Sequence, residues 1–374
     1  MIGRLAVAVA SLVGTLGLAT MAGPANLTPS VPATPTDRAR IDHIVIVVLE
    51  NQTAEAVLTT HRAQAPFLNG LATQGTQLDA MFGVDHHSLP NYLAMISGHA
   101  STKKTRADCF VFSCVFKPGQ DETVADQLEA KGLTWKAYID GMPTPCQHSV
   151  EGRIERYRSG YAARHNPFLY FAAIVRDQAR CAAHDVPIAQ LAQDLTGSTL
   201  PNLSFIVPDT CHDGHDCPLA TADTWVKETI GPLLNRPEIR DHGLVVVTFD
   251  EADSSDVRGC CGNSRGGRVA TWVMGAGVVV GGHSATPYNH YSLLRTIEDT
   301  FALPCLRHAC DQQTAAYGPE IWGGVAPTVV DTAALPPLPN RLALAGGTLM
   351  VVVMAIVGSF WTKHHRRRPA TTKP

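Results

Sequence analysis

The chain has little charge, and neither sign is in clear excess. Charged residues make up 17% of its 374 residues, and the formal net charge is −3. A nucleic-acid-binding domain needs a basic face to meet phosphate groups, so this composition gives no support to that class of protein. The sequence also lacks internal repeats, C-x-x-C pairs and the G-x-x-x-x-G-K-[ST] pattern of nucleotide-binding loops. Repeat architectures and P-loop enzymes are therefore not indicated.

Two long apolar runs stand near the ends of the chain. The first, residues 5–21, precedes small residues and is typical of a secretory signal removed on export. The second, residues 342–361, is uncharged, long enough to span a membrane, and followed by a Lys/Arg-rich tail. A buried core helix is the alternative for this second run. We expect a single-pass protein of the cell membrane, with the tail in the cytoplasm and the main domain outside the cell.

The expected organisation has six parts. They are a signal peptide, a linker, one large domain, a Pro/Ala-rich linker, a transmembrane helix and a basic tail, at residues 1–25, 26–39, 40–312, 313–341, 342–361 and 362–374.

All ten cysteines lie within the large domain. An even number in an exported domain favours disulfides, and near neighbours are the simplest pairs. The expected bridges are Cys109–Cys114, Cys211–Cys217, Cys305–Cys310 and Cys146–Cys181. Cys260 and Cys261 are adjacent, and a bridge between neighbours is strained, so their state is left open. A cysteine-rich zinc site is the alternative, without the paired spacing that would favour it.

Strand-like and helix-like segments alternate along the large domain. We expect strands at 43–49, 134–139, 203–207, 243–249 and 269–274, and helices at 65–73, 92–97, 124–130, 221–234 and 290–301. This alternation requires crossover connections, so the predicted fold class is α/β, a mainly parallel sheet with helices on both faces. Residues 141–189 show no clear periodicity and are interpreted as an irregular insertion over the crevice at the sheet edge.

Polar side chains follow two of the predicted strands directly. Glu50 and Asn51 come after one β-branched run, and Asp250 and Glu251 come after another. Side chains just beyond the carboxyl ends of parallel strands project into the crevice where open α/β sheets bind ligands. Three carboxylates and an amide there would repel one another unless a hard cation bound them. The sequence therefore predicts a divalent metal site, with calcium, magnesium, manganese, zinc and iron all left open.

A candidate nucleophile lies beside this predicted site. Pro90 suits the first turn of a helix, which puts Ser88 at or just before the helix N-terminus, an end that attracts phosphate. A metal would lower the pKa of the Ser88 hydroxyl for attack on phosphorus, with Asn91 donating to a phosphoryl oxygen. The alternative is that Ser88 is only a helix N-cap.

Histidines and carboxylates also crowd the segment between Cys211 and Cys217. A zinc site there is one interpretation, but such a short loop cannot aim every side chain at one ion. We favour His215 as the general acid for the leaving alkoxide. A histidine that only braces the loop is the alternative. Asp213 is a further candidate.

Several segments together resemble a known family. They follow one another in the order that this family has. In chain order they are Glu50-Asn51, His86-x-Ser88-x-Pro90-Asn91-Tyr92, Pro208-Asp209 through Asp216, Asp250-Glu251 and His290-Tyr291-Ser292. In this the chain resembles the bacterial phosphoesterase family of secreted acid phosphatases and phospholipases C, within the alkaline phosphatase superfamily. The resemblance implies metal ligation by the residues named above, a phosphoseryl intermediate on Ser88, contacts from His86 and His215 to the phosphoryl or leaving group, and a lesser role for His290.

The chain departs from that family pattern at two positions. His87 stands where a proline is expected before the serine, and Asp209 stands where asparagine is frequent. His87 is either an extra phosphate contact or points away. Asp209 could recruit a second cation or form a salt bridge.

The resemblance implies an acid phosphatase acting on phosphate monoesters, phosphoinositides included, so the expected partner is a phosphorylated small molecule or a phospholipid headgroup. A phospholipase C-type phosphodiesterase is the alternative within the family. A sulfatase would need the pattern S-x-P-x-R, and the segment Ser88-Leu89-Pro90-Asn91-Tyr92 has no arginine. A non-catalytic surface binding protein on the same fold is the alternative from another class.

Overall fold

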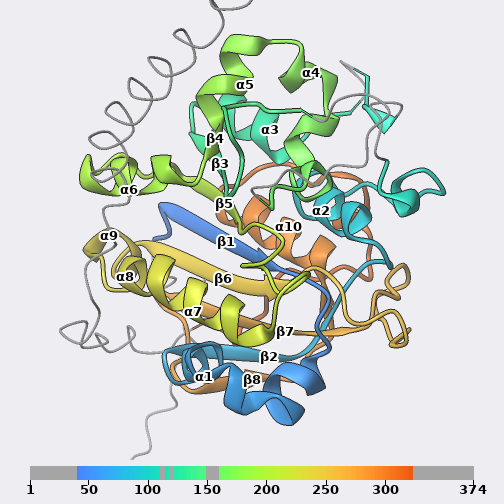
Figure 1. Ribbon diagram of the computed structural model, residues 1–374, viewed down its shortest axis with the longest axis vertical. Coiled ribbons are helices and arrows are strands. Elements are labelled where there is room, and N and C mark those ends of the chain that lie inside the picture. Colours follow the sequence, from blue (N-terminus) through green and yellow to red (C-terminus); the bar gives the residue numbers. More distant parts are fainter. Residues whose placement is uncertain (1–39, 110–113, 118–120, 149–159, 323–374) are drawn as a thin grey trace, which may run out of the picture. The chain divides into compact units, whose positions relative to one another are not determined.

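The computed structural model describes residues 40–109, 114–117, 121–148 and 160–322 (Figure 1). The chain divides into two compact units, residues 1–37 and 38–374, and every described residue belongs to the second. The predicted signal peptide, the linker that follows it and residues 342–361 lie outside the described residues. The packed chain continues beyond residue 312, since Ile321 is fully buried.

A nine-stranded sheet forms the centre of the described unit, in the order β4-β3-β5-β1-β6-β7-β2-β8, with β9 also paired to β2. Neighbours from β4 to β6 are parallel, whereas β7 is antiparallel to both β6 and β2. The strands are β1 His43–Leu49, β2 Gly75–Phe82, β3 Trp135–Ile139, β4 Asp185–Pro187, β5 Leu203–Val207, β6 Gly243–Phe249, β7 Arg268–Gly275, β8 Gly282–Ser284 and β9 Tyr288–Asn289. The predicted α/β class and mainly parallel sheet are confirmed.

Strand β1 lies in the middle of this sheet and is buried on both faces. It pairs in parallel with β5 on one side and β6 on the other, and its residues from Ile44 to Leu49 have no exposed surface. Val and Ile suit such a position because branched side chains pack well on a pleated surface. The register sets Leu49 opposite Phe249, so the residues that follow, Glu50 and Asp250, leave the sheet side by side.

Helices cover both faces of the sheet. In the view of Figure 1, α7 lies in front of the strands and α10 behind them. Helix α7 packs with α1, and α10 packs with α2, all ten residues of which are buried. The helices are α1 Pro66–Gly70, α2 Ser88–Ser97, α3 Val124–Ala130, α4 Ala172–Val175, α5 Gln178–His184, α6 Ala189–Thr196, α7 Leu219–Thr229, α8 Gly231–Leu234, α9 Pro237–Arg240 and α10 His290–Thr300.

Several elements differ from expectation, among them the short strands β8 and β9, which were not predicted, and the predicted helix 221–234, which is divided into α7 and α8. Strand β2 was not predicted, because its sequence GTQLDAMF has no regular alternation, and its pairing with β7 and β8 determines its form. The predicted irregular insertion, residues 141–189, contains β4, α4 and α5, and β4 extends the main sheet beside β3.

Five disulfides join the ten cysteines. The four predicted bridges, Cys109–Cys114, Cys146–Cys181, Cys211–Cys217 and Cys305–Cys310, are confirmed. Cys260 and Cys261, left open from the sequence, are bonded to each other. No cysteine is left for the alternative zinc site.

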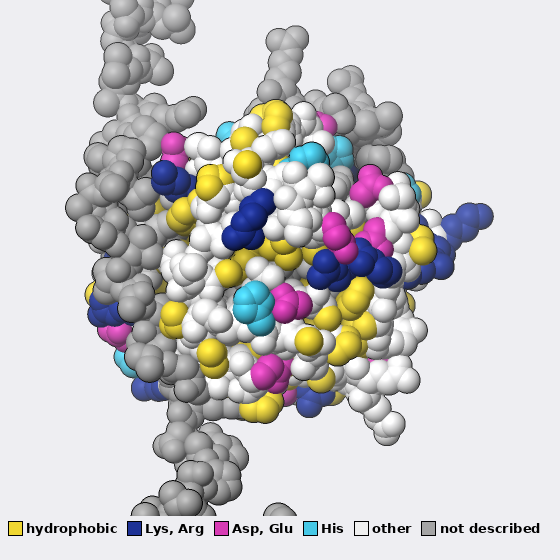
Figure 2. Space-filling view, turned by 90° about the horizontal axis from the view of Figure 1, so that it is seen from below, with side chains coloured by type: hydrophobic (Ala, Val, Ile, Leu, Met, Phe, Trp, Pro, Cys, Tyr) yellow, Lys and Arg dark blue, Asp and Glu magenta, His cyan; other side chains and the backbone are white. Residues whose placement is uncertain are grey.

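The surface carries charges of both signs close together. On the face shown in Figure 2, acidic and basic side chains lie next to one another among apolar ones. Among the described residues, Arg258 pairs with Glu55 and Asp256, and Arg268 also pairs with Glu55. This face therefore presents no continuous block of one sign.

The predicted localisation needs correction. Among the described residues, no helix is both long and apolar enough to cross a membrane. Their longest α-helices, α7 and α10, have 11 residues each, whereas a helical span needs about 20. Residues 342–361, on which the prediction rested, lie outside the described residues. The prediction of a single-pass protein anchored in the cell membrane through this segment is corrected accordingly.

Candidate active site

The carboxyl ends of β1 and β6 meet at one buried edge of the sheet. Glu50 and Asp250, the first residues after these strands, have no exposed surface. The backbone N–H of Asn51 donates to Oδ1 of Asp250 over 3.2 Å, and Asn51 takes a left-handed backbone conformation with φ of 57°. The structure therefore brings together the two strand-end pairs that the sequence singled out.

Ser88 lies beside this edge at the first position of α2. Its hydroxyl donates to Oε2 of Glu50 over 2.8 Å, and the hydroxyl of Tyr92 donates to Oε1 of the same carboxylate over 2.7 Å. Residues four apart lie on one face of a helix, which explains why both hydroxyls reach one side chain. The candidate nucleophile is thus in direct contact with a candidate metal ligand.

His86 contacts Glu251, the second of the two acidic residues that follow β6. Its Nδ1 lies 2.6 Å from Oε2 of Glu251, and its Nε2 lies 3.0 Å from the carbonyl oxygen of Asp256. The hydrogen bond to Glu251 raises the pKa of His86, which favours the imidazolium form. With both nitrogens engaged, His86 can orient Glu251 at the site.

Asn91 and His87 differ in their surroundings. The Asn91 amide accepts from the backbone N–H groups of Val84 and Asp85 and donates to the carbonyls of Asp85 and His87. Asn91 therefore fixes the turn before Ser88, and its polar atoms already have partners. The His87 side chain is 62% exposed, and its Nδ1 lies 3.9 Å from Oδ2 of Asp108.

Two functional candidates come from the insertion and were missed in the sequence. They are Arg164 and His165, on a short 3-10 helix, Ala163–His165. His165 is 1% exposed and stacks on the Tyr92 ring, with centroids 5.3 Å apart and planes at 4°. Neither residue belongs to a recognisable motif, and the surrounding sequence shows no periodicity, so no local signal marks them.

His165 stands between two buried carboxylates. Its Nε2 lies 3.3 Å from Oε1 of Glu50, and its Nδ1 lies 3.3 Å from Oδ2 of Asp213. Asp213 is itself fully buried, accepts the backbone N–H of His215 on Oδ1, and accepts the N–H of Glu50 on its carbonyl oxygen. Asp213, only a further candidate from the sequence, thus joins the Glu50 side of the site.

Arg164 extends along the end of α2 toward His215. Its Nη2 lies 3.3 Å from Nε2 of His215, and its Nε lies 3.9 Å from Oδ2 of Asp108, whose Oδ1 accepts the N–H of Leu89. His215 in turn places Nδ1 at 2.9 Å from Oδ1 of Asp216. A guanidinium and an imidazole therefore stand at the same helix end as Ser88.

Asp209 belongs to a separate ion cluster. His212 lies between it and Asp140, with Nδ1 at 3.2 Å and 2.7 Å from their carboxylates, and Trp225 also donates to Asp140. These carboxylates raise the pKa of His212 to about 10. The salt-bridge alternative for Asp209 accounts for these contacts.

His290 contacts the site only through the backbone. Its Nε2 donates to the carbonyl oxygen of Asp250, and burial lowers its pKa to about 4. His290 therefore braces the strand end that carries Asp250.

The electrostatics of the buried edge suit a divalent cation. Burial raises the pKa of Glu50 to about 8, and both burial and Glu50 raise the pKa values of Asp250 and Asp213. Oδ2 of Asp250 and Oδ2 of Asp213 are buried without a hydrogen-bond partner. Buried, mutually repelling carboxylates with open oxygens fit a metal ion, which would neutralise them and fill their free coordination positions.

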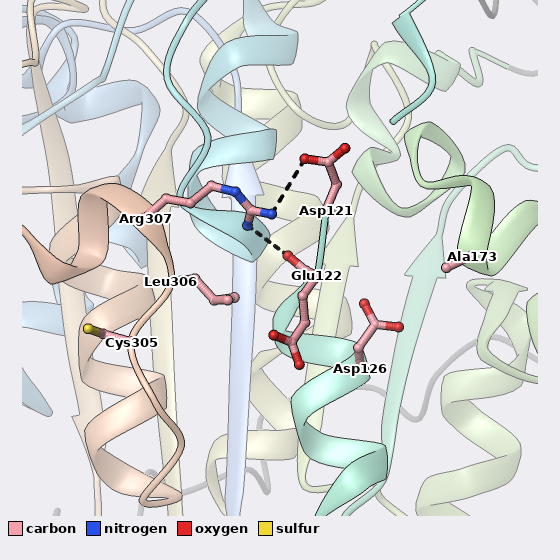
Figure 3. Close-up of a pocket in the computed structure, with 7 residues that line it drawn as sticks. All are labelled: Asp121, Glu122, Asp126, Ala173, Cys305, Leu306 and Arg307. Atoms are coloured by element: carbon pink, nitrogen blue, oxygen red, sulfur yellow. Dashed lines mark hydrogen bonds and ion pairs between the residues drawn. The ribbon is translucent and has the colours of Figure 1, made fainter. Parts of the chain in front are cut away.

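A cavity lies elsewhere in the described part of the chain. It has a volume of about 570 Å³ and is lined by Asp121, Glu122, Asp126, Ala173, Cys305, Leu306 and Arg307. Figure 3 shows Arg307 crossing it to pair with Asp121 and to donate to the backbone oxygen of Glu122. None of the candidate site residues lines this cavity.

Known phosphatases are similar in sequence to this chain. A phosphatidylinositol-3-phosphatase of Mycobacterium tuberculosis is 27% identical over 315 residues, which cover 84% of this chain and 93% of that protein. A probable acid phosphatase of Kluyveromyces lactis is 29% identical over 252 residues, 65% of this chain and 56% of that one. The chain thus spans only a little over half of the second relative.

Solved structures show the same fold at low identity. An alkaline phosphatase superfamily protein of Vibrio parahaemolyticus matches 73% of this chain and 71% of its own, with a TM-score of 0.50 and 11% identity. The lipoteichoic acid synthase LtaP of Listeria monocytogenes matches 74% of this chain and 77% of its own, at the same TM-score and identity. The expected alkaline phosphatase-like fold is confirmed.

The family is established by a match over most of the domain. The model of the phosphoesterase family matches residues 59–304, more than half of the chain, including Ser88, Asp213 and the end of β6. The chain is therefore a hydrolase of phosphoric ester bonds and belongs to the phosphoesterase family.

Proposed function

We propose that this protein is a metal-dependent phosphomonoesterase that works through a phosphoserine on Ser88. The observation that carries the proposal is the 2.8 Å hydrogen bond from Ser88 to Glu50 inside the buried carboxylate cluster. Glu50, Asn51, Asp250 and Glu251 would hold a divalent cation. When bound, the cation would lower the pKa of the Ser88 hydroxyl and offset charge on the phosphoryl group.

Two displacements complete the reaction. In the first, Ser88 Oγ releases its proton to solvent and bonds to phosphorus, while the bond from phosphorus to the ester oxygen breaks and the leaving alkoxide takes a proton from His215. In the second, water attacks the phosphoserine, which releases inorganic phosphate and restores the Ser88 hydroxyl. At the N-terminus of α2 the N–H of Leu89 is bonded to Asp108 and Pro90 has none, so the backbone N–H of Ser88 would be the helix-end donor to a phosphoryl oxygen.

Arg164 and His215 supply the remaining groups in the proposal. The guanidinium of Arg164 would bind phosphoryl oxygens, because it lies at the Ser88 end of α2 and is only 11% exposed. In the structure, Nη2 of Arg164 lies 3.3 Å from Nε2 of His215. Binding of a phosphate would draw Arg164 away and let His215 carry the proton for the leaving group.

Monoesters are the proposed substrates, with phosphoinositides among them. The relatives named above support this choice, since both carry phosphatase names and one is named for a phosphoinositide. The proposal includes export through the signal peptide predicted at residues 1–25, which five disulfides in the domain support.

Hydrolysis of p-nitrophenyl phosphate and bis-p-nitrophenyl phosphate by the purified chain tests the proposal. We expect release from the monoester, loss of release with EDTA, and loss by at least about a thousandfold in Ser88→Ala. Ser97→Ala is the matched control, since Ser97 is buried on the same helix and its hydroxyl contacts the carbonyl of Leu93 and Nδ1 of His99 but no candidate site residue. Activity that survives in Ser88→Ala would refute the nucleophile, and preference for the diester would favour the phospholipase C alternative.

The metal is tested separately. Asp250→Asn should lose both bound metal and turnover, because Asp250 is fully buried and one of its oxygens has no partner. A variant that folds, keeps its metal and keeps its activity would show that the ligands lie elsewhere.

A further inference from the structure

The side chain of His165 has buried polar atoms without a hydrogen-bond partner among the described residues. Both of its ring nitrogens are buried without a hydrogen-bond partner, and so is Oδ2 of Asp213. Buried polar atoms are nearly always paired, so three such atoms in one place point to a missing partner. The His165 nitrogens lie near carboxylate oxygens, but neither contact is aligned as a hydrogen bond.

The spacing of these atoms is that of ligands around one ion. One ligand atom each from Glu50, His165 and Asp213 lie within 4.8 Å of one another, and all three residues are buried. Tetrahedral ligands held about 2.0–2.1 Å from a metal stand about 3.3 Å apart. The separation of Nε2 of His165 from Oε1 of Glu50 is 3.3 Å.

We propose that His165 is a nitrogen ligand of the catalytic cation, binding through Nε2 beside Glu50, and that Asp213 orients the ring by accepting a hydrogen bond from Nδ1. The inference rests on the proposed metal dependence and adds to it a ligand from the insertion. Metal-bound histidines commonly donate their other nitrogen to a carboxylate, which fixes the tautomer. Stacking on Tyr92, itself hydrogen-bonded to Glu50, holds the ring in this orientation.

The chemical consequence concerns which cation binds. An all-oxygen site of carboxylates and an amide suits calcium or magnesium, whereas an imidazole ligand suits zinc, iron, copper or nickel. With His165 in the ligand set, the site should select a transition metal over the two hard cations. The ligand also ties metal binding to the insertion, because His165 is the last residue of its short 3-10 helix.

The competing account is an imidazolium between two carboxylates. In that case, His165 would be protonated, would pair with Glu50 and Asp213, and would not touch the metal. The two accounts differ in an observable that needs no turnover. A ligand nitrogen couples magnetically to a bound paramagnetic metal, and a nitrogen outside the coordination sphere does not.

Pulsed EPR of the Mn²⁺-loaded full chain tests the inference. We expect modulation from an imidazole nitrogen in the wild type, its loss in His165→Gln, and its retention in His184→Gln. His184 is a suitable control because it lies in the same insertion with Nδ1 at 2.7 Å from the carbonyl of Trp135. A wild type that binds Mn²⁺ without this modulation, or modulation that persists in His165→Gln, would overturn the inference.

Measurement of metal affinity gives a second test of the inference. Asp213→Asn should weaken Zn²⁺ binding by about 10- to 100-fold, as expected when an orienting carboxylate is lost. Competition between Zn²⁺ and Ca²⁺ on the wild type should favour Zn²⁺, and equal preference would count against a nitrogen ligand. If the protein hydrolyses monoesters and binds metal without these signatures, only the role of His165 is refuted. If the protein has no activity, the proposed function itself is refuted.

Discussion

Replacing Glu298 by Gln should change how the stability of the domain depends on pH. Glu298 lies on α10 without exposed surface, and its Oε1 accepts the N–H of Leu306 over 2.8 Å. Its Oε2 has no hydrogen-bond partner. Burial raises the pKa of this carboxyl from 4.5 to about 8. A neutral amide can keep the bond to Leu306 without ever carrying the buried charge.

The sign of the effect follows from proton binding. Between pH 4.5 and about 8, the folded chain holds a proton on Glu298 that the unfolded chain has released. Stability contributed by this proton is therefore fully present below pH 4.5 and is lost as pH rises through the folded pKa. A pKa difference of about 3.5 limits the contribution of this group to the free energy of unfolding to roughly 5 kcal/mol. Glu298→Gln should have near wild-type stability at pH 4.5 and exceed it by about 2 kcal/mol or more at pH 8.5.

Urea unfolding monitored by tryptophan fluorescence at several pH values measures this difference. Glu228→Gln is the matched control, since Glu228 is an exposed residue of α7. The control should follow the wild-type curve throughout. Parallel curves for Glu298→Gln and the wild type between pH 4.5 and 8.5 would show that Glu298 does not hold its proton in the folded state.

Three further changes probe the site. Tyr92→Phe removes the hydroxyl that donates to Oε1 of Glu50. In urea unfolding of the metal-free chain, the free energy of unfolding should fall by about 1–3 kcal/mol. An unchanged value would argue against that hydrogen bond. Arg164→Gln should raise the inhibition constant of inorganic phosphate at least about tenfold while urea unfolding stays near wild type, whereas unaltered phosphate inhibition would remove Arg164 from the phosphoryl site. Asn91→Ala opens the turn before Ser88, so kcat should fall about 10- to 100-fold with little change in KM for p-nitrophenyl phosphate, and full kcat would mean that the turn holds without its amide.

The strands that carry the site could be located from the sequence with their observed bounds. Strands β1 and β6 are continuous β-branched runs because both of their faces are buried, and such runs have few alternative structures. Their parallel register then brings Glu50 and Asp250 together. The position of each residue directly after a strand was therefore enough to predict that the two lie side by side. Strand β2 carries polar residues in no regular order, and its place depends on partners distant in sequence.

The rest of the site depends on tertiary contacts that no local pattern encodes. His165 reaches Glu50 from a position 115 residues further along the chain, within a segment that shows no periodicity. Its relevance becomes visible only when the ring is found between two buried carboxylates. Asn91 shows the reverse case. The sequence suggested that its amide donates to a phosphoryl oxygen, whereas in the structure the amide is bonded to the backbone of the turn before Ser88.

The Cys146–Cys181 bridge encloses the part of the chain that supplies Arg164 and His165. It joins residues 35 positions apart, and Cys146 also donates its N–H to the carbonyl of Asp185 at the start of β4. Closing a loop of this length restricts the unfolded chain and is worth about 3–4 kcal/mol in the chain-entropy description. Assembly of the catalytic centre is thereby linked to oxidative maturation, since a reduced chain would have to order these two residues without the covalent constraint.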